Sequence, residues 1–145
     1  MGAREILLLG NPELYRVCEA VEPHEVAGLA HAVADLHATM AKFQDEFGWG
    51  RAIAAPQIGV HKRIVAVRIT PDDPRTLYNP TIEAVGDARF EYWEDCMSFP
   101  ELLVRIDAPT EALVRYRDEH WQARSAKVSM DFAGLFQHEL DHLDG

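Results

Sequence analysis

The stretch Asp131-Phe132-Ala133-Gly134-Leu135-Phe136-Gln137-His138-Glu139-Leu140-Asp141-His142-Leu143 decides the architecture that we expect at the C-terminal end of this chain. Its apolar residues recur at helical spacing, which predicts a helix over Asp131–Leu143. The residues on its apolar side are Phe132, Leu135, Phe136 and Leu140. Because aspartate is among the residue types that cap helices, we expect Asp131 to be the N-cap.

Within this helix, His138-Glu139-Leu140-Asp141-His142 forms a His-Glu-x-x-His pattern. Residues four apart lie one turn above each other, so both imidazoles can reach one metal ion, and Glu139 is close enough to act on its bound water. A five-residue pattern also arises by chance, and the alternative is a surface helix rich in histidine and acids. The pattern favours one divalent metal ion and hydrolysis of an amide bond.

A catalytic ion of this kind usually takes three protein ligands, at distances of about 2.0 to 2.3 Å, and leaves one position to water. The sequence stops at Gly145, so we expect the third ligand upstream. Cys96 is the strongest candidate, because thiolate is a good ligand for zinc and for ferrous iron. The alternative is a buried cysteine that acts as a small hydrophobe. Rival ligands, for which ordinary roles are the better interpretation, are His24, His31, His37, His61 and His120.

The rest of the chain predicts one long helix followed by strands. Residues 24–47 have apolar side chains at helical spacing, with charged residues such as Asp35 expected to point outward, and Gly48 and Gly50 end the helix. Residues 6–9 fit a strand or an extended arm. Short strands are predicted at residues 64–69, 76–78, 81–85, 89–93, 102–106, 111–117 and 123–128.

This order of elements predicts the fold class. Strands in a run between two helices favour an α+β fold, in which antiparallel strands pack around the C-terminal helix that carries the His-Glu-x-x-His pattern. The length of 145 residues fits a single domain over residues 1–145.

The composition excludes several classes of function. Hydrophobic residues make up 48% and charged residues 26%, as in globular proteins and unlike disordered or fibrous ones. The formal net charge of −10 disfavours binding to nucleic acid or to an anionic membrane. No apolar run is long enough to span a bilayer or to form a signal peptide core. We therefore expect a cytoplasmic protein with reduced thiols, in which Cys18 is an ordinary buried one.

Three blocks of this sequence resemble the peptide deformylases, the metal hydrolases that remove the N-formyl group from new bacterial proteins. Residues 50–57, Gly-Arg-Ala-Ile-Ala-Ala-Pro-Gln, are similar to the family's Gly-x-Gly-x-Ala-Ala-Pro-Gln. Residues 94–98, Glu-Asp-Cys-Met-Ser, are similar to its Glu-Gly-Cys-Leu-Ser, and residues 137–142 to its Gln-His-Glu-x-Asp-His. The blocks appear in the family's order, and the opening residues 10–21, the long helix and the strand block extend the likeness to nearly the whole chain.

The resemblance implies that Cys96, His138 and His142 bind one divalent metal, usually Fe2+ in cells and often Zn2+ in purified protein. Glu139 would take a proton from the metal-bound water and pass it to the leaving amine.

The resemblance also implies an oxyanion site, in which Gln57 and the backbone N–H of Met97 stabilise the developing negative charge. From the residues alone, Gln57 is only a turn residue after Pro56. The implied substrate is a peptide whose N-terminal methionine carries a formyl group.

The residues expected to bind this substrate are Gly50, Arg51, Ala52 and Asp95, and three of them depart from the family's pattern. Ala52 adds a methyl group where a peptide backbone is expected to approach closely. Arg51 replaces an apolar residue next to the methionine pocket, and Asp95 replaces a glycine. Arg51 and Asp95 could form an ion pair that narrows the cleft, or both could face solvent.

These departures leave two alternatives open. One is an amidase that removes a formyl or acyl group from another small amine, and the other is a non-catalytic metal-binding relative. The sequence also lacks the C-terminal helix that many members carry after the last motif. We expect catalysis to survive this difference, because no motif residue lies beyond His142.

Overall fold

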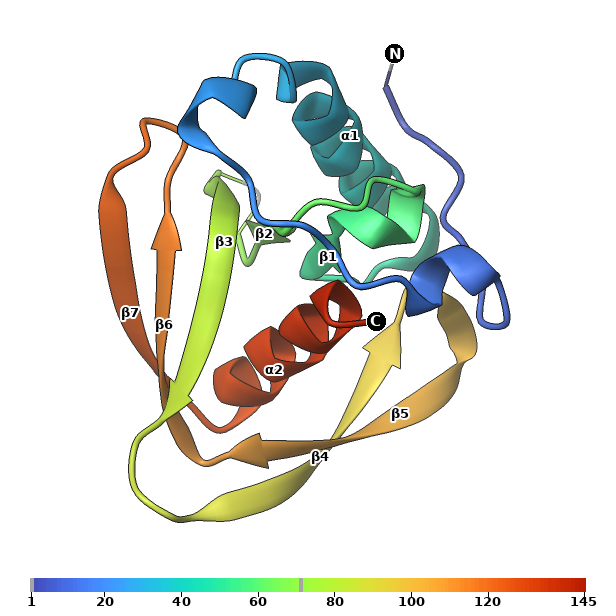
Figure 1. Ribbon diagram of the computed structural model, residues 1–145. Helices are drawn as coiled ribbons and strands as arrows, with labels where there is room; N and C mark the ends of the chain where they lie inside the picture. The colour runs from blue at the N-terminus through green and yellow to red at the C-terminus, as the bar shows by residue number, and fades with distance from the viewer. Residues whose placement is uncertain (1, 71) are drawn as a thin grey trace.

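The computed structural model describes residues 2–70 and 72–145 (Figure 1). In chain order, its elements are the 3-10 turns η1 (Pro12–Tyr15) and η2 (Pro23–Glu25), α1 (Ala30–Phe47), β1 (Ala52–Ala54), η3 (Ala55–Ile58), β2 (Ile64–Arg68), β3 (Pro74–Ala84), β4 (Arg89–Cys96), β5 (Phe99–Pro109), β6 (Glu111–Arg117), β7 (Ala123–Ser129) and α2 (Asp131–Leu143). Over the described residues, β1-β2-β3-β6-β7 form one sheet in that order, and β4 pairs with β5 in a separate hairpin. All these strand pairs are antiparallel. The α+β class expected from the sequence is confirmed.

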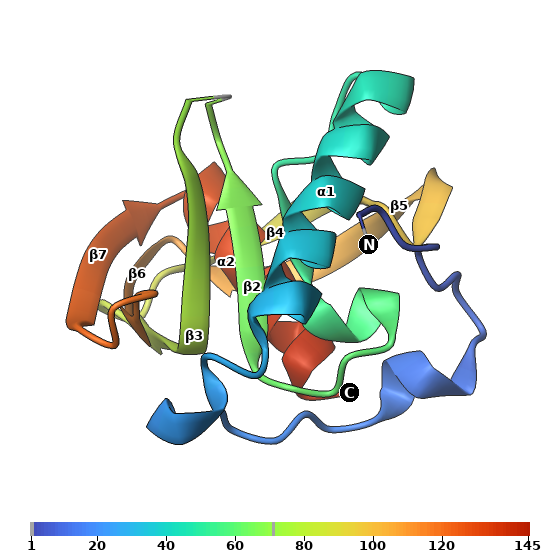
Figure 2. The same ribbon diagram turned by 90° about the horizontal axis from the view of Figure 1, so that it is seen from above.

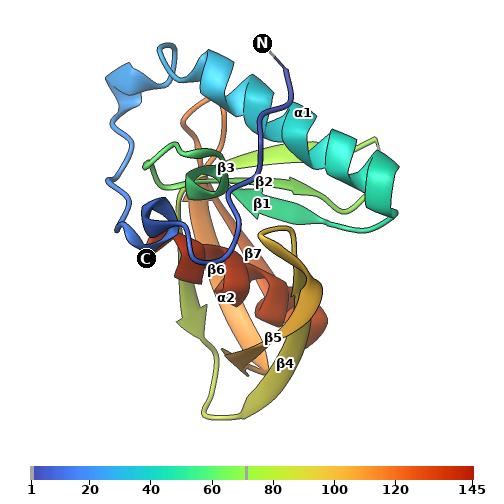
Figure 3. The ribbon, with the colours of Figure 1, turned by 90° about the vertical axis from the view of Figure 1, so that its right-hand side faces the viewer.

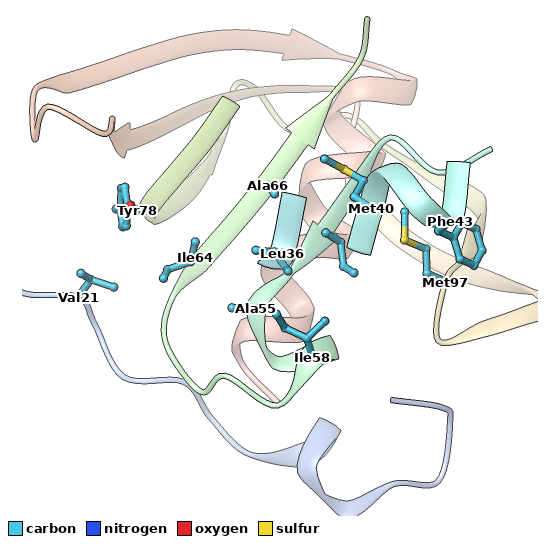
Figure 4. Packing of buried hydrophobic residues seen from close by; sticks show 11 residues of the cluster. Val21, Leu36, Met40, Phe43, Ala55, Ile58, Ile64, Ala66, Tyr78 and Met97 are labelled. Atoms are coloured by element: carbon cyan, nitrogen blue, oxygen red, sulfur yellow. The ribbon is translucent and has the colours of Figure 1, made fainter. Parts of the chain in front are cut away.

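Strand β2 is buried on both faces, because a helix covers each side of this part of the sheet. Ile64 and Ala66 lie in the hydrophobic cluster on the α1 side, whereas Val65 and Val67 lie in the cluster on the α2 side. Successive strand residues point to opposite faces, which explains why this strand is apolar at every one of these positions. Seen from above, α1 runs alongside β2 (Figure 2), and Figure 4 shows the packing of the cluster on the α1 side.

Helix α2 lies between the sheet and the β4–β5 hairpin (Figure 3). The hairpin turns one face of its strands toward α2, and on this face Ile106 and Ala108 of β5 are buried. Leu135 and Leu143 of α2 are buried on the other side, in the cluster with β2. The helix is therefore held on two sides, which fixes the position of the residues that it carries.

The structure corrects the predicted N-terminal helix. Residues 24–47 do not form one helix, since α1 begins at Ala30 and the preceding residues form tight turns with bonds such as Leu29 N–H to the Val26 carbonyl. Pro23 starts η2, and turns of this type keep a residue spacing close to that of an α-helix, so the apolar pattern continues through them. The helix ends as expected, with Gly48 in the left-handed conformation.

Two aspartates also differ from the prediction. Asp35 does not point outward, because the residue is 6% exposed and its carboxylate accepts hydrogen bonds from Gly2 N and Arg4 Nε. Asp131 is the first residue of α2 and not its N-cap. The cap is Met130, whose carbonyl accepts the hydrogen bond from Gly134 N. In the first turn, the Asp131 carboxylate still favours the helix through the macrodipole.

The strand predictions are confirmed in position but not in number. The segments at residues 76–78 and 81–85 belong to one strand, β3, which continues through an irregularity at Asn79 with φ 51°. The short strand β1 was not predicted, since Ala52–Ala54 has no apolar alternation to mark it. Residues 6–9 form an extended arm, and Cys18 is a buried thiol outside any disulfide. No helix in the described part of the chain has both the length and the apolar character needed to cross a membrane.

Candidate metal centre

Three side chains from two elements meet at the contact between β4 and α2. Nε2 of His138 lies 3.1 Å from Nε2 of His142, and Sγ of Cys96 lies 3.5 Å from Nε2 of His142. All three ligand atoms lie within 4.8 Å of one another. Around a tetrahedral zinc ion with ordinary bond lengths, nitrogen atoms lie about 3.3 Å apart, and nitrogen and sulfur about 3.6 Å apart. The spacing of this triad therefore fits one such ion.

Burial keeps the two histidines in the form that binds metal. It lowers the pKa of His138 to about 3 and that of His142 to about 4, since the charged imidazolium is poorly solvated there. The neighbouring His142 contributes to the lower pKa of His138. Both rings are consequently neutral near pH 7, with a nitrogen lone pair available to a cation.

No other group of three such side chains within ligand distance occurs in residues 2–70 and 72–145. Two of the rival histidines have other partners. His37 Nε2 lies 2.7 Å from Thr76 Oγ1, and His61 Nε2 lies 3.0 Å from the Glu13 carbonyl oxygen. These contacts agree with the ordinary roles expected for them.

Glu139 lies beside the triad and is 5% exposed. Burial, and to a smaller extent the Glu94 carboxylate, raises the pKa of Glu139 to about 8. Its Oε2 atom has no hydrogen-bond partner among the described residues. A nearby cation would favour the ionised form and lower this pKa again. Glu139 is thus a buried carboxyl group that can hold or release a proton near neutral pH.

Gln57 is held from both ends of its side-chain amide. Oε1 accepts a hydrogen bond from Ala54 N at 2.9 Å, and Nε2 donates to Ser98 Oγ at 3.0 Å and lies 3.7 Å from Cys96 Sγ. The N-terminal arm supports this arrangement, since Leu7 N donates to the Gln57 carbonyl and Leu9 N to the Ser98 carbonyl. The structure therefore places Gln57 against the cysteine of the triad, and it adds Ser98, whose contact the sequence did not predict.

Gly50 and Met97 meet by direct packing. Gly50 has φ +107°, and a Cβ added to it would lie 2.4 Å from Met97 Cε and 3.2 Å from Phe43 Cδ1. Gln44 Nε2 donates a hydrogen bond to the Gly50 carbonyl. The backbone conformation favours glycine here, and an added methyl group would force the end of the Met97 side chain to move.

The predicted ion pair between Arg51 and Asp95 is wrong. Arg51 Nη2 donates to Tyr92 Oη at 2.9 Å and lies 3.5 Å from Glu94 Oε2. Asp95 is exposed, since neighbouring residues of β4 point to opposite faces and Glu94 takes the inner one. Ala52 is 6% exposed and lies in the hydrophobic cluster on the α2 side.

A pocket of about 320 Å³ opens on the triad. Its walls include His138 and His142 of the triad, together with Asp141. The remaining lining residues come mainly from the N-terminal segment and β5, and they are Leu9, Leu14, Tyr15, Val104, Arg105, Ile106 and Gly145. The histidines are therefore reachable from outside the protein.

Comparisons with known sequences and structures all identify members of one protein family. The sequence profile of the family described as polypeptide deformylase matches residues 3–145. The peptide deformylase of Leptospira biflexa is 31% identical over 157 residues, which cover 100% of this chain and 85% of that protein. The peptide deformylase of Picosynechococcus sp. is 37% identical over 100 residues, or 66% of this chain and 54% of that protein. This match thus spans about half of the length of that relative.

Among solved structures, a peptide deformylase from Synechococcus elongatus in complex with actinonin superposes with a TM-score of 0.82 at 26% identity. The superposition covers 97% of this chain and 73% of that one. The fold of this chain therefore matches that of a peptide deformylase.

Proposed function

Since the chain belongs to the polypeptide deformylase family, we propose that it is a metal-dependent amide hydrolase that removes the formyl group from the N-terminal methionine of new proteins. One observation carries this proposal. The ligand atoms of Cys96, His138 and His142 are spaced for a single ion, with the buried carboxyl group of Glu139 beside them. We further propose that residues 1–145 form one deformylase domain that acts in the cytoplasm, without binding nucleic acid or membrane.

We propose that the triad binds one divalent metal ion, and that its Cys-His-His donor set accepts Fe2+ as well as Zn2+. When bound, such an ion supplies a Lewis acid and lowers the pKa of a coordinated water. Glu139 takes the proton from the attacking water and later donates it to the leaving amine, for which its buried carboxyl group is suited.

Gln57 and Met97 stabilise the oxygen of the substrate as it gains negative charge. The Gln57 amide group donates to Ser98 Oγ at 3.0 Å and to Cys96 Sγ at 3.7 Å. Because the bond to sulfur is the weaker one, its N–H can turn to the substrate oxygen when substrate binds. The backbone N–H of Met97 follows the ligand Cys96 directly, and we propose it as the second donor. Gly50 keeps the loop before β1 close to Met97.

A panel of N-formyl and N-acetyl compounds, incubated with protein loaded with Fe2+ or Zn2+, tests the proposal. Release of formate from formyl-Met-Ala-Ser, with little or no release of acetate from the acetylated peptide, is expected. Absence of formate release from every compound with a fully metallated protein would favour a non-catalytic metal-binding relative.

A second candidate function is the deformylation of another small amine, and the contacts of Arg51 favour it. The guanidinium of Arg51 and the carboxyl group of Glu94 place charged groups near the triad, where a methionine side chain needs apolar contacts. A formylated amine that is cleaved much faster than formyl-Met-Ala-Ser would establish this function instead.

A further inference from the structure

Two rows of residues, one on α2 and one on β4, run beside each other from the triad toward the start of α2. Gly134, His138 and His142 follow one another at intervals of four along α2, so they share one side of the helix at steps of about 6 Å. Tyr92, Glu94 and Cys96 alternate along β4 and share its inner face. Both ends of the rows are in contact, since Cys96 meets His142 at one end and Tyr92 meets Gly134 at the other.

The contact between Tyr92 and Gly134 leaves no space between the rows at this end. A Cβ added to Gly134 would lie 2.1 Å from Cδ1 and 2.5 Å from Cγ of Tyr92. Only glycine permits the ring to approach the helix so closely. The ring therefore lies against the backbone of α2, about one helical turn before the ligand His138.

Arg51 fixes the ring in this position. Its Nη2 atom donates to Tyr92 Oη at 2.9 Å and lies 3.5 Å from Glu94 Oε2, so one guanidinium joins two members of the β4 row. The guanidinium carbon also lies 5.9 Å from the centre of the Phe132 ring, in the first turn of α2. The loop before β1, β4 and α2 are thereby linked around Tyr92, which makes the ring a fixed wall.

We propose that Tyr92 is a specificity-determining residue that closes the metal site on the side of the first turn of α2. The proposal rests on the deformylase activity proposed above. A side chain next to the formyl group can extend from His138 toward Gly134 by less than one helical turn, about 5.4 Å, before it meets the Tyr92 ring. An extended methionine side chain needs the whole of this length, whereas the side chains of alanine and glycine are much shorter. Tyr92 should therefore weaken the preference of the proposed deformylase for methionine over alanine or glycine next to the formyl group.

The test compares wild type with Tyr92→Ala, and with Tyr92→Leu as a second variant that leaves a smaller cavity. Each zinc-loaded protein is assayed with formyl-Met-Ala-Ser and formyl-Ala-Ala-Ser, and the ratio of the two kcat/KM values is the readout. We expect either variant to raise the ratio in favour of methionine by roughly tenfold or more, since a few methylene groups are worth this much in a pocket. The matched control is Trp93→Ala, because Trp93 is exposed on the opposite face of β4.

A second readout does not depend on turnover. Calorimetry measures binding of the product tripeptides Met-Ala-Ser and Ala-Ala-Ser to the same proteins, and the ratio of the two Kd values should shift in the same direction. The proposal is overturned if the Kd ratio changes less than about twofold in folded Tyr92 variants, or if it changes as much in Trp93→Ala. The methionine side chain of the substrate would then lie elsewhere, such as in the pocket lined by Val104 and Ile106. The same conclusion follows if neither tripeptide binds to any variant. If no protein released formate but the Kd ratio still shifted in the Tyr92 variants, the proposed activity would be refuted and the role of Tyr92 would stand.

Discussion

The sulfur of Cys96 lies 3.5 Å from Nε2 of His142, across the contact between β4 and α2. Residues 46 positions apart in the sequence are thereby brought to the distance that a shared metal ion requires. The hairpin and the helix also pack against each other away from the triad, where Tyr92 meets Gly134. Metal binding should consequently depend on these side chains more than on the rest of the fold.

Replacement of a ligand should therefore remove the metal. We expect one metal ion per chain in purified protein, and a strong loss of occupancy in Cys96→Ser or His138→Ala, measured by elemental analysis after dialysis. Cys18→Ser is the matched control, because Cys18 is buried in the hydrophobic cluster on the α2 side and does not belong to the triad. Full occupancy in Cys96→Ser would show that the third ligand is another residue.

The role of Glu139 can be separated from metal binding. Glu139→Gln keeps the size of the side chain and removes its proton-transfer chemistry, so we expect full metal content and a rate lower by about 10² to 10⁴. Initial rates with formyl-Met-Ala-Ser, measured beside metal content, test this. A variant that keeps wild-type turnover would exclude Glu139 from proton transfer.

A larger residue at Gly50 should destabilise the protein. In Gly50→Ala, the added methyl group meets Met97 and the backbone has φ +107°, so we expect a loss of about 1 to 3 kcal/mol in the free energy of unfolding. Gly59→Ala is the control, because Gly59 has φ +83° but no atom within 4 Å of the added Cβ. Denaturant unfolding of both variants separates the two causes. Equal losses would mean that the contact with Met97 adds no cost.

Much of this site could be predicted from the sequence, because its chemistry depends on short local patterns. Helical spacing alone predicted that His138 and His142 share one side of α2. The position of Cys96 required the resemblance as well as the chemistry of thiolate, since no local rule brings β4 to α2. The partner of Arg51 was mispredicted, although strand alternation could have indicated Glu94 in place of Asp95.

The errors in the fold have a similar origin. Asp35 was expected to face solvent because it is a charged residue in an amphipathic pattern. In the structure, the N-terminal residues Gly2 and Arg4 lie against it and donate hydrogen bonds to its carboxylate. The contact of Tyr92 with Gly134 depends on how the hairpin folds over α2, and no spacing in the sequence reports such a long-range contact.

The buried carboxylate of Asp35 should make part of the stability pH-dependent. Hydrogen bonds from Gly2 N and from Arg4 lower its pKa below the ordinary value. A lowered pKa stabilises the folded state fully above the unfolded-state pKa, about 3.9, and this contribution is lost as the pH falls through the folded-state pKa. Asp35→Asn should therefore lower the Tm at pH 7, and the difference from wild type should shrink below about pH 4. A difference in Tm that stays constant from pH 7 to pH 3 would contradict this.

The last prediction concerns the two charged residues that depart from the family's pattern, Arg51 and Asp95, for which the structure implies opposite outcomes. Asp95 is exposed on the outer face of β4, so Asp95→Gly should leave kcat/KM for formyl-Met-Ala-Ser within about twofold of wild type, as for most surface substitutions.

Arg51→Leu removes the hydrogen bond that holds Tyr92 and leaves the partly buried Glu94 without its cation. We expect this variant to raise the formyl-Met to formyl-Ala ratio, because the Tyr92 ring can then move. We also expect it to lose about 1 kcal/mol of stability, since the ion pair is only partly exposed to solvent. Steady-state kinetics and denaturant unfolding of both variants measure these effects. If Asp95→Gly changed the ratio as much as Arg51→Leu, the negative charge on the outer face of β4 would have to act on the substrate directly.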